Sequence, residues 1–339
     1  VLSEPQASAA EQNIWVVGAA SSLESSPNVR VLLRTTCAGI YDHGVVAAVE
    51  RLSDTVTGAS PVLRERYWRI RAAQIVLATG AIEQPAVFAM NDLPGVMLAG
   101  SVRQYLNRYA VACGRRVAIV TSDDEAYRTA LDLAAAGVTI AAIVDSRART
   151  YGALPKLARD RGLPIFEASH VRSARGGARV CALAIVTADS VGNDIECDLV
   201  AMSSGWQPAL HLYCHAGGRL IFDEERKCLV PKEGPANLRV VGAAAAAAIA
   251  VPAFADLPRG RTDSRRHPAP ESASRCWIDF QHDVTVRDLE IAVRENYVSV
   301  EHLKRYTTTG MSVDQGKTSN LNALSILARL TDRSIAETG

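Results

Sequence analysis

Five polar side chains beside two glycines form the part of the sequence whose chemistry is easiest to name. They are Lys304, Arg305, Lys317, Thr318 and Ser319, and the glycines are Gly310 and Gly316. A glycine turn presents backbone N–H groups, and ammonium and hydroxyl groups add donors, so the set suits a phosphate. The alternative is that these side chains only cap helices. The run Gly316–Ser319 matches the end of a P-loop, but the upstream glycine and the preceding strand are missing, so we reject a nucleoside triphosphatase.

A second candidate site is the turn made by Ala78, Thr79 and Gly80. It ends an apolar strand that we expect at Gln74–Ala81. In parallel sheets, ligands bind beyond the carboxyl ends of the strands, and a glycine there lets a cofactor approach the backbone. The alternative is an ordinary turn between a strand and a loop, and these residues alone do not separate the two interpretations.

A βαβ unit is expected between residues 116 and 145. Strands at Arg116–Thr121 and Val138–Val144 flank a helix at Glu125–Ala136. Where a dinucleotide-binding fold carries GxGxxG, this chain reads Ser122-Asp123-Asp124-Glu125-Ala126, whose carboxylates suit a helix start and repel a pyrophosphate. Asp145 stands where a ribose-binding acid is expected, but without the glycine loop we expect a solvated residue at the end of a strand. We therefore predict Rossmann-like packing with little or no dinucleotide binding.

Metal-binding and nucleophile patterns are weak in this sequence. The seven cysteines are scattered and form no CxxC, which favours reduced thiols in a cytoplasmic protein over disulfides, zinc or an iron–sulfur site. His211 and His215 are four residues apart, but no acid follows at the distance that a zinc site needs. We therefore expect structural or solvated roles for the histidines and no catalytic residue.

Length and charge limit the classes of partner. The chain has 339 residues, of which 48% are hydrophobic, and a formal net charge of +1, which predicts neither nucleic acid nor membrane as a partner. The apolar run Val240–Ala255 is alanine-rich and interrupted by Pro252, so it is too weak to span a bilayer. No signal peptide is recognisable, and the start at Val1 leads us to expect a fragment of a longer cytoplasmic protein.

The order of strand and helix patterns predicts several domains. The strand-like runs Val29–Thr35 and Tyr41–Leu52 predict an antiparallel meander, and Ser101 is expected to cap a helix that ends at Tyr109. The expected layout is a partial first dinucleotide-binding domain with the meander at 1–112, an inserted second Rossmann-like domain at 113–203, a return to the first domain at 204–255, a linker at 256–275 and a small helical domain at 276–330.

The segment Arg71–Gly100 resembles a known protein family. This segment is similar to the central part of the two-dinucleotide-binding-domain flavoproteins, and most of all to the alpha chain of heterotetrameric sarcosine oxidases. The match continues at Tyr105–Tyr109, Tyr127–Leu133 and Ser204–Pro208. The resemblance implies an α/β fold of the FAD/NAD(P)-binding Rossmann type with a small C-terminal helical domain. In that family a GxGxxG loop opens the first domain, so it would lie upstream of Val1 and leave half a dinucleotide site here.

The resemblance also implies cofactors. Flavin-binding relatives carry Gly-Asp where this chain reads Val241-Gly242-Ala243, and the missing acid fits NAD rather than FAD beside Gly242. The family holds FMN between its alpha and beta subunits and FAD in the beta subunit. We expect the turn at 316–319 and the helix end at Lys304 and Arg305 to contribute to the FMN pocket, at its phosphate.

Residues Cys276–Asn320 resemble the helical domain of this family, whose cousins bind an iron–sulfur cluster through four cysteines. The matching positions here are Cys276, Ile278, Asp314 and Ser319. Three of four thiolates are missing, and a cluster needs soft thiolate ligands, so we expect no cluster.

The activity implied by the resemblance is that of a heterotetramer with beta, gamma and delta subunits. It demethylates sarcosine to glycine, produces hydrogen peroxide and passes a one-carbon unit to tetrahydrofolate. The sites for sarcosine and tetrahydrofolate would lie outside this chain, which we expect to be inactive alone. The alternatives are a subunit of another secondary-amine or opine-type oxidoreductase that depends on FAD, and a non-catalytic truncated remnant.

Overall fold

The structure is a computed structural model that describes residues 9–54, 63–187, 191–247 and 275–339. The chain divides into two compact units. The first unit comprises Val1–Ala81, Pro208–Ile221 and Leu229–Ala248, and the second comprises Ile82–Gln207, Phe222–Cys228 and Ile249–Gly339. The alanine-rich run Val240–Ala255 is described only as far as Ala247, and Gly242–Ala245 form a short 3-10 helix there. The linker expected at 256–275 lies outside the described residues, Arg275 excepted. The domain boundaries expected from the sequence stay a prediction.

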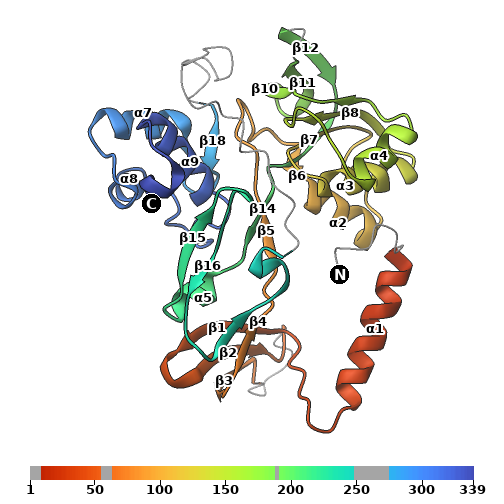
Figure 1. Cartoon of the computed structure of the whole chain (residues 1–339). Coiled ribbons are helices and arrows are strands. Elements are labelled where there is room, and N and C mark those ends of the chain that lie inside the picture. Colours follow the sequence, from red (N-terminus) through yellow and green to blue (C-terminus); the bar gives the residue numbers. More distant parts are fainter. Residues whose placement is uncertain (1–8, 55–62, 188–190, 248–274) are drawn as a thin grey trace. The chain divides into compact units, whose positions relative to one another are not determined.

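The first unit contains an antiparallel sheet of β1 (Thr35–Tyr41), β2 (Val45–Arg51) and β3 (Glu65–Arg71) (Figure 1). It also contains a parallel pair of strands, β4 (Ile75–Leu77) and β17 (Leu238–Val240). Its helices are α1 (Ala9–Ser25) and α5 (His211–His215). The expected meander is therefore present. The strand expected at Val29–Thr35 is wrong, because β1 begins only at Thr35 and Arg34 has a left-handed backbone with φ 53°. A short 3-10 helix, Asp42–Gly44, connects β1 and β2.

A five-stranded parallel sheet forms the centre of the second unit. Its order is β6 (Val96–Leu98), β13 (Leu199–Ser203), β7 (Arg116–Thr121), β8 (Thr139–Asp145) and β9 (Ile165–Phe166). Val117 and Ile119 point to one face of the sheet, and Ala118 and Val120 point to the other. The first face packs against helices α2 (Ala99–Tyr109), α3 (Glu125–Ala135) and α4 (Ala153–Asp160). Because both faces are covered, the strands are continuously apolar, as the sequence showed.

The predicted βαβ unit is confirmed as β7, α3 and β8. Ser101 is not the cap of α2, because the helix begins two residues earlier and its N-cap is Leu98. An antiparallel sheet of β10 (His170–Gly176), β11 (Val180–Val186) and β12 (Val191–Glu196) supplies Leu183 and Ile185 to the second face of the parallel sheet.

Residues 275–339 form a helical module within the second unit. Strands β18 (Trp277–Asp279) and β19 (Val284–Thr285) precede α7 (Val286–Arg294), α8 (Val300–Thr307), α9 (Asn320–Leu330) and α10 (Ile335–Thr338). Thr285 is the N-cap of α7 and forms a reciprocal capping box with Asp288. The core of the module includes Val87 and Ala89 from the segment that follows β5.

Four further strands lie where the chain passes from one unit to the other. They are β5 (Ala81–Glu83), β14 (Trp206–Pro208), β15 (Arg219–Asp223) and β16 (Cys228–Glu233). None of the helices in the described parts of the chain is long and apolar enough to cross a membrane.

Candidate functional site

Two segments predicted to bind a dinucleotide lie next to each other in the first unit. β4 and β17 run parallel, with Leu77 opposite Val240, so their carboxyl ends meet at one edge. Ala78, Thr79 and Gly80 follow the first strand, and Gly242 follows the second by two residues. The Val241 N–H donates to the Leu77 carbonyl over 2.9 Å and fixes this arrangement.

This edge is open and glycine-bearing. Ala78, Thr79 and Gly242 are exposed. Gly80 and Gly242 have φ of 75° and 64°, and no protein atom lies within 4 Å of where a Cβ would stand on either. The Thr79 hydroxyl donates to the Ala209 carbonyl over 2.7 Å and holds the turn in shape. A ligand could therefore approach both backbones closely, as a dinucleotide requires.

The turn at 310–319 in the helical module is organised by Asp279, which the sequence analysis did not single out. Asp279 is 3% exposed, and its Oδ2 accepts from the Gly310 N–H at 2.8 Å and from the Ser319 hydroxyl at 3.3 Å. Asp314 Oδ2 accepts from the Thr318 hydroxyl at 3.3 Å. Both hydroxyls predicted to meet a phosphate therefore face carboxylates. An acid at the end of a short apolar strand was the one available signal for Asp279.

Gly310 and Gly316 both lie against Asn320. Their φ angles are 69° and 71°, and a Cβ on either would stand about 2 Å from Asn320 Oδ1. That oxygen is buried without a hydrogen-bond partner, while Asn320 Nδ2 donates to the Gln315 carbonyl over 3.3 Å. Asn320 therefore sets the close packing of the turn and requires glycine at both positions.

The three predicted cations differ in how they are held. Arg305 donates to the Glu301 carbonyl at 3.0 Å and pairs with the Glu301 carboxylate at 3.5 Å, so its charge is already partnered on α8. Within the described part of the chain, neither the Lys304 nor the Lys317 ammonium has a hydrogen bond or ion pair. Lys317 is exposed, and its backbone carbonyl accepts from Gln84 Nε2 at 3.1 Å. These contacts leave the two lysines as the cations available to an anion.

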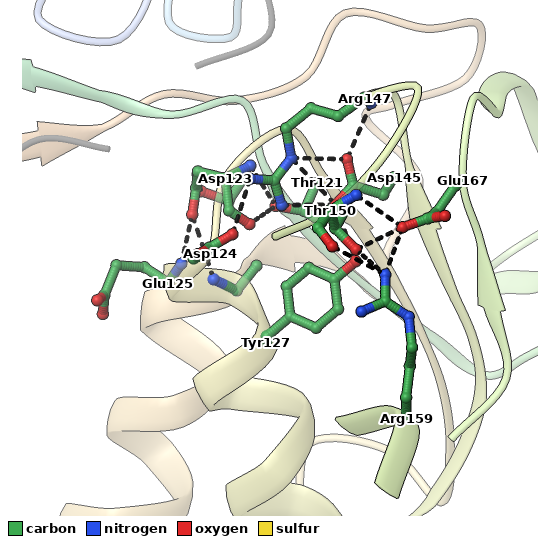
Figure 2. A network of polar contacts seen from close by, with 12 residues as sticks. Thr121, Asp123, Asp124, Glu125, Tyr127, Asp145, Arg147, Thr150, Arg159 and Glu167 are labelled. Atoms are coloured by element: carbon green, nitrogen blue, oxygen red, sulfur yellow. Dashed lines mark hydrogen bonds and ion pairs between the residues drawn. The ribbon is translucent and has the colours of Figure 1, made fainter. Parts of the chain in front are cut away.

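The carboxyl edge of the five-stranded sheet is occupied by the chain's own acids (Figure 2). Asp123 is fully buried, and its Oδ1 accepts from the N–H groups of Glu125 at 2.7 Å and Ala126 at 3.3 Å at the start of α3. These are the donors that would meet a phosphate in a dinucleotide-binding fold. A carboxylate of the chain thus stands at the anion position of the helix.

Asp145 is not the solvated residue that the sequence led us to expect. It is fully buried, and its Oδ2 accepts from Arg147 Nη2 at 2.7 Å and from the Tyr127 hydroxyl at 2.9 Å. Arg147 Nη1 also donates to Asp124 over 2.7 Å, so one guanidinium joins two acids, as Figure 2 shows. Burial and the neighbouring Asp145 raise the pKa of Tyr127. The local signal for this buried acid is Arg147, which follows it by only two residues.

Cys276 lies within the core of the helical module. It is fully buried, and burial raises the pKa of its thiol to about 12. The described residues contain no group of three or more His, Cys, Asp or Glu side chains that could hold a metal ion. Ile278, at the position of a second cluster cysteine, is also fully buried in that core.

Comparison with known proteins gives relatives along nearly the whole chain. Residues 273–339 match the family model for the sarcosine oxidase A3 domain. The sarcosine oxidase subunit alpha of Rhizobium meliloti (strain 1021) is 39% identical over 347 residues, which cover 94% of this chain and 34% of that protein. The sarcosine oxidase subunit alpha of Corynebacterium sp. (strain P-1) is 34% identical and covers 93% and 36%. The chain thus spans about a third of the length of these relatives.

Among solved structures, the L-proline dehydrogenase from P. horikoshii shares the fold. The TM-score is 0.70 at 17% sequence identity, and the match covers 100% of this chain and 67% of that one. The predicted fold class is therefore confirmed: an α/β fold of the two-dinucleotide-binding-domain flavoprotein type with a small C-terminal helical domain.

Proposed function

Because the chain belongs to the family of sarcosine oxidase alpha subunits, we propose that it is part of a sarcosine oxidase complex in which it holds half of an NAD site and one side of an FMN site. The observation that carries the proposal is the open edge where Ala78–Gly80 and Gly242 meet at the ends of two parallel strands. A dinucleotide needs such an edge, with glycines at close approach.

The residues at this edge fit NAD. Gly80 and Gly242 leave room for a cofactor at the backbone, and Val241-Gly242-Ala243 offers no carboxylate for the sugar-like chain of a flavin. The second sheet offers no such edge, because Asp123 occupies the N–H groups at the start of α3. We infer that the first unit is the dinucleotide-binding part and that the Rossmann-like sheet of the second unit is a scaffold.

The FMN phosphate would rest on the two lysines. Lys304 and Lys317 are the unpaired cations of the predicted set, whereas Thr318 and Ser319 donate to carboxylates, and Arg305 is paired with Glu301. We therefore retain Lys304 and Lys317 as phosphate ligands and assign the two hydroxyls to holding the turn. An FMN bound here between subunits would accept electrons from the amine oxidation and deliver them to oxygen.

The reaction of the complex is a proposal from the family. Sarcosine would be demethylated to glycine at FAD in a beta subunit, with release of hydrogen peroxide and transfer of the one-carbon unit to tetrahydrofolate. The sarcosine and tetrahydrofolate sites would lie outside this chain. The contribution of the chain is binding, at Gly80 and Gly242 for NAD and at Lys304 and Lys317 for FMN.

The NAD site is tested by comparing Gly242→Ala with Gly217→Ala. Both glycines belong to the first unit and have positive φ, and a Cβ added to either would meet no atom within 4 Å, so the backbone cost is matched. We expect Gly242→Ala to reduce tightly bound NAD, measured after extraction from the complex, by at least about tenfold, which a loss of about 1.4 kcal/mol produces. Equal NAD content in both variants would contradict the site.

The FMN site is tested by Lys317→Ala in the chain co-expressed with a flavin-bearing beta subunit. We expect a lower FMN content per complex because one of two phosphate-binding charges is lost. Lys156→Ala is the matched control, since Lys156 is exposed and pairs with Asp160 on α4. FMN content that equals that of Lys156→Ala would remove Lys317 from the phosphate site.

A further inference from the structure

Two cysteines lie opposite each other at one end of the antiparallel sheet of the second unit. Strands β11 and β12 pair in antiparallel register, with Ala182 opposite Glu196. The register continues by one step to Cys181 and Cys197, because the Cys197 N–H donates to the Cys181 carbonyl over 3.1 Å. The Cα atoms of directly opposite residues in antiparallel strands are about 4.5–5.5 Å apart. That separation lies within the range of about 4.4–6.8 Å that a disulfide bond spans.

Both cysteine side chains belong to one face of this sheet. Leu183 lies opposite Ile195, and both pack into the core on the second face of the parallel sheet. Side chains at every second position of a strand share a face. Cys181 stands two positions before Leu183, and Cys197 stands two positions after Ile195 and packs in the same core. The two thiols are therefore neighbours across the strands, as directly opposite side chains are.

The two thiols differ in their access to solvent. Cys197 is 3% exposed, and burial raises the pKa of its thiol to about 12, so it stays protonated at neutral pH. Cys181 is exposed. Ala182 and Val180 pair with consecutive residues of β10, so Cys181 between them is the extra residue of a β-bulge. An oxidant in solution can therefore reach Cys181, whereas Cys197 is shielded beside it.

We propose that Cys181 and Cys197 are a redox-active pair, in which a hydroperoxide oxidises Cys181 and Cys197 then closes a disulfide bond between β11 and β12. The pair goes beyond the proposed function, because neither a cofactor nor a partner subunit takes part. The proposed complex would itself release hydrogen peroxide, but the same reaction follows from peroxide of any source.

The reaction has two balanced steps. The Cys181 thiolate attacks one oxygen of hydrogen peroxide, so that an S–O bond forms, the O–O bond breaks and hydroxide leaves, and Cys181 becomes a sulfenic acid. The Cys197 sulfur then attacks the Cys181 sulfur, the S–O bond breaks, and the Cys197 proton leaves with the hydroxyl group as water. The first hydroxide takes up the proton that Cys181 lost. Two thiols are thus oxidised to one disulfide, and one peroxide is reduced to two molecules of water.

The test is treatment of the full chain with hydrogen peroxide, alkylation of the remaining thiols in denaturant, and mass spectrometry of a digest made without reductant. A protease specific for glutamate cuts after Glu196, between the two cysteines, so a bridge holds two peptides together until a reductant separates them. We expect this linked pair in the unsubstituted chain. Cys181 present as sulfinic or sulfonic acid, with Cys197 alkylated, would overturn the proposal.

Two variants identify the cysteines that are joined. Cys197→Ser should abolish the linked pair and leave Cys181 to be oxidised further, to the sulfinic acid. Cys214 is the matched control, since it is exposed on helix α5 and lies on the same glutamate-bounded peptide as Cys197. Cys214→Ser should keep the linked pair. A pair that persists in Cys197→Ser and disappears in Cys214→Ser would show that Cys197 is not the partner of Cys181.

Cys181→Ser keeps the proposal testable if Cys197→Ser does not fold, because position 181 is exposed. In this variant Cys197 should survive peroxide as a free thiol, since the buried, protonated thiol is not the entry point of the oxidant. Loss of the Cys197 thiol in Cys181→Ser at the rate seen in the unsubstituted chain would show that peroxide reaches Cys197 directly, and the pair would not be the unit that reacts.

Discussion

Gly316 and Gly162 have nearly the same positive φ but differ in surroundings, which makes them a matched pair. Their φ angles are 71° and 69°, and a Cβ on Gly162 would meet no atom within 4 Å, whereas one on Gly316 would stand 2.1 Å from Asn320 Oδ1. We expect Gly162→Ala to cost about 1 kcal/mol, the ordinary cost of positive φ. Gly316→Ala should cost about 3 kcal/mol, because it adds overpacking.

Urea unfolding of both variants checks this difference. If Gly316→Ala costs no more than Gly162→Ala, Asn320 can move away, and it does not set the shape of the turn.

Replacing Arg147 allows the free-energy cost of leaving the buried acid Asp145 unpaired to be measured. Arg147→Leu would leave Asp145 fully buried without its cation, and breaking a buried pair in this way costs about 3–5 kcal/mol. Lys156→Ala breaks an exposed pair with Asp160 and should cost less than about 1 kcal/mol. Calorimetric melting temperatures of the two variants measure the contrast. Similar melting temperatures would mean that Asp145 takes up a proton or reaches water when Arg147 is lost.

From sequence, single residues could be proposed as site residues only where a local pattern marked them. The Ala78–Gly80 turn and Gly242 could be proposed as a site because each glycine follows a short apolar run. Asp279 and Glu83 were missed, since their partners Ser319 and Gly100 lie 40 and 17 positions away and no local pattern marks them. Burial of a charge depends on long-range packing, which periodicity does not reveal.

At the scale of elements, the start of helix α7 is the clearest case of a helix boundary that the local sequence determines. Thr285 and Asp288 form a capping box, in which the Asp288 carboxylate accepts from the Thr285 N–H at 2.8 Å. Thr285→Ala should cost about 1 kcal/mol. Because the two side chains act together, Thr285→Ala and Asp288→Ala combined should cost less than the sum of the single changes. A double-mutant cycle by urea unfolding measures this coupling, and strict additivity would contradict it.

Other element boundaries were set by contacts that the local sequence does not encode. Helix α2 begins at Ala99 because its Gly100 N–H meets Glu83, and Ser101 therefore caps nothing. Strands β10 and β12 were missed because polar residues such as His170, Arg175 and Asp194 lie along them. These two flank the apolar β11 and take their strand conformation from pairing with it.

At the scale of the molecule, the position of the candidate site depends on pairing between distant parts of the chain, which local sequence patterns do not reveal. The strand and helix order predicted an α/β fold, but the placement of Ala78–Gly80 beside Gly242 needed a strand pair that spans more than 160 residues of sequence. The helical module likewise packs on the segment after β5, which the sequence marks only as a proline-containing loop. Long-range pairing thus decides where the candidate site lies.

The attachment of the helical module gives the last prediction. Asn91 is buried and pairs with the Trp277 backbone twice, since its Nδ2 donates to the carbonyl at 2.9 Å and its Oδ1 accepts from the N–H at 2.9 Å. Asn91→Ala leaves both backbone groups unpaired and should cost about 2–4 kcal/mol. Asn107→Ala removes an exposed amide on α2 and should cost less than about 1 kcal/mol. Hydrogen exchange should then show α7 and α9 losing protection in Asn91→Ala while β7 and β8 keep theirs, because the lost contacts join the module to the sheet-bearing part of the unit. Equal loss of protection in all four elements would instead show that module and sheet unfold together as one cooperative structure.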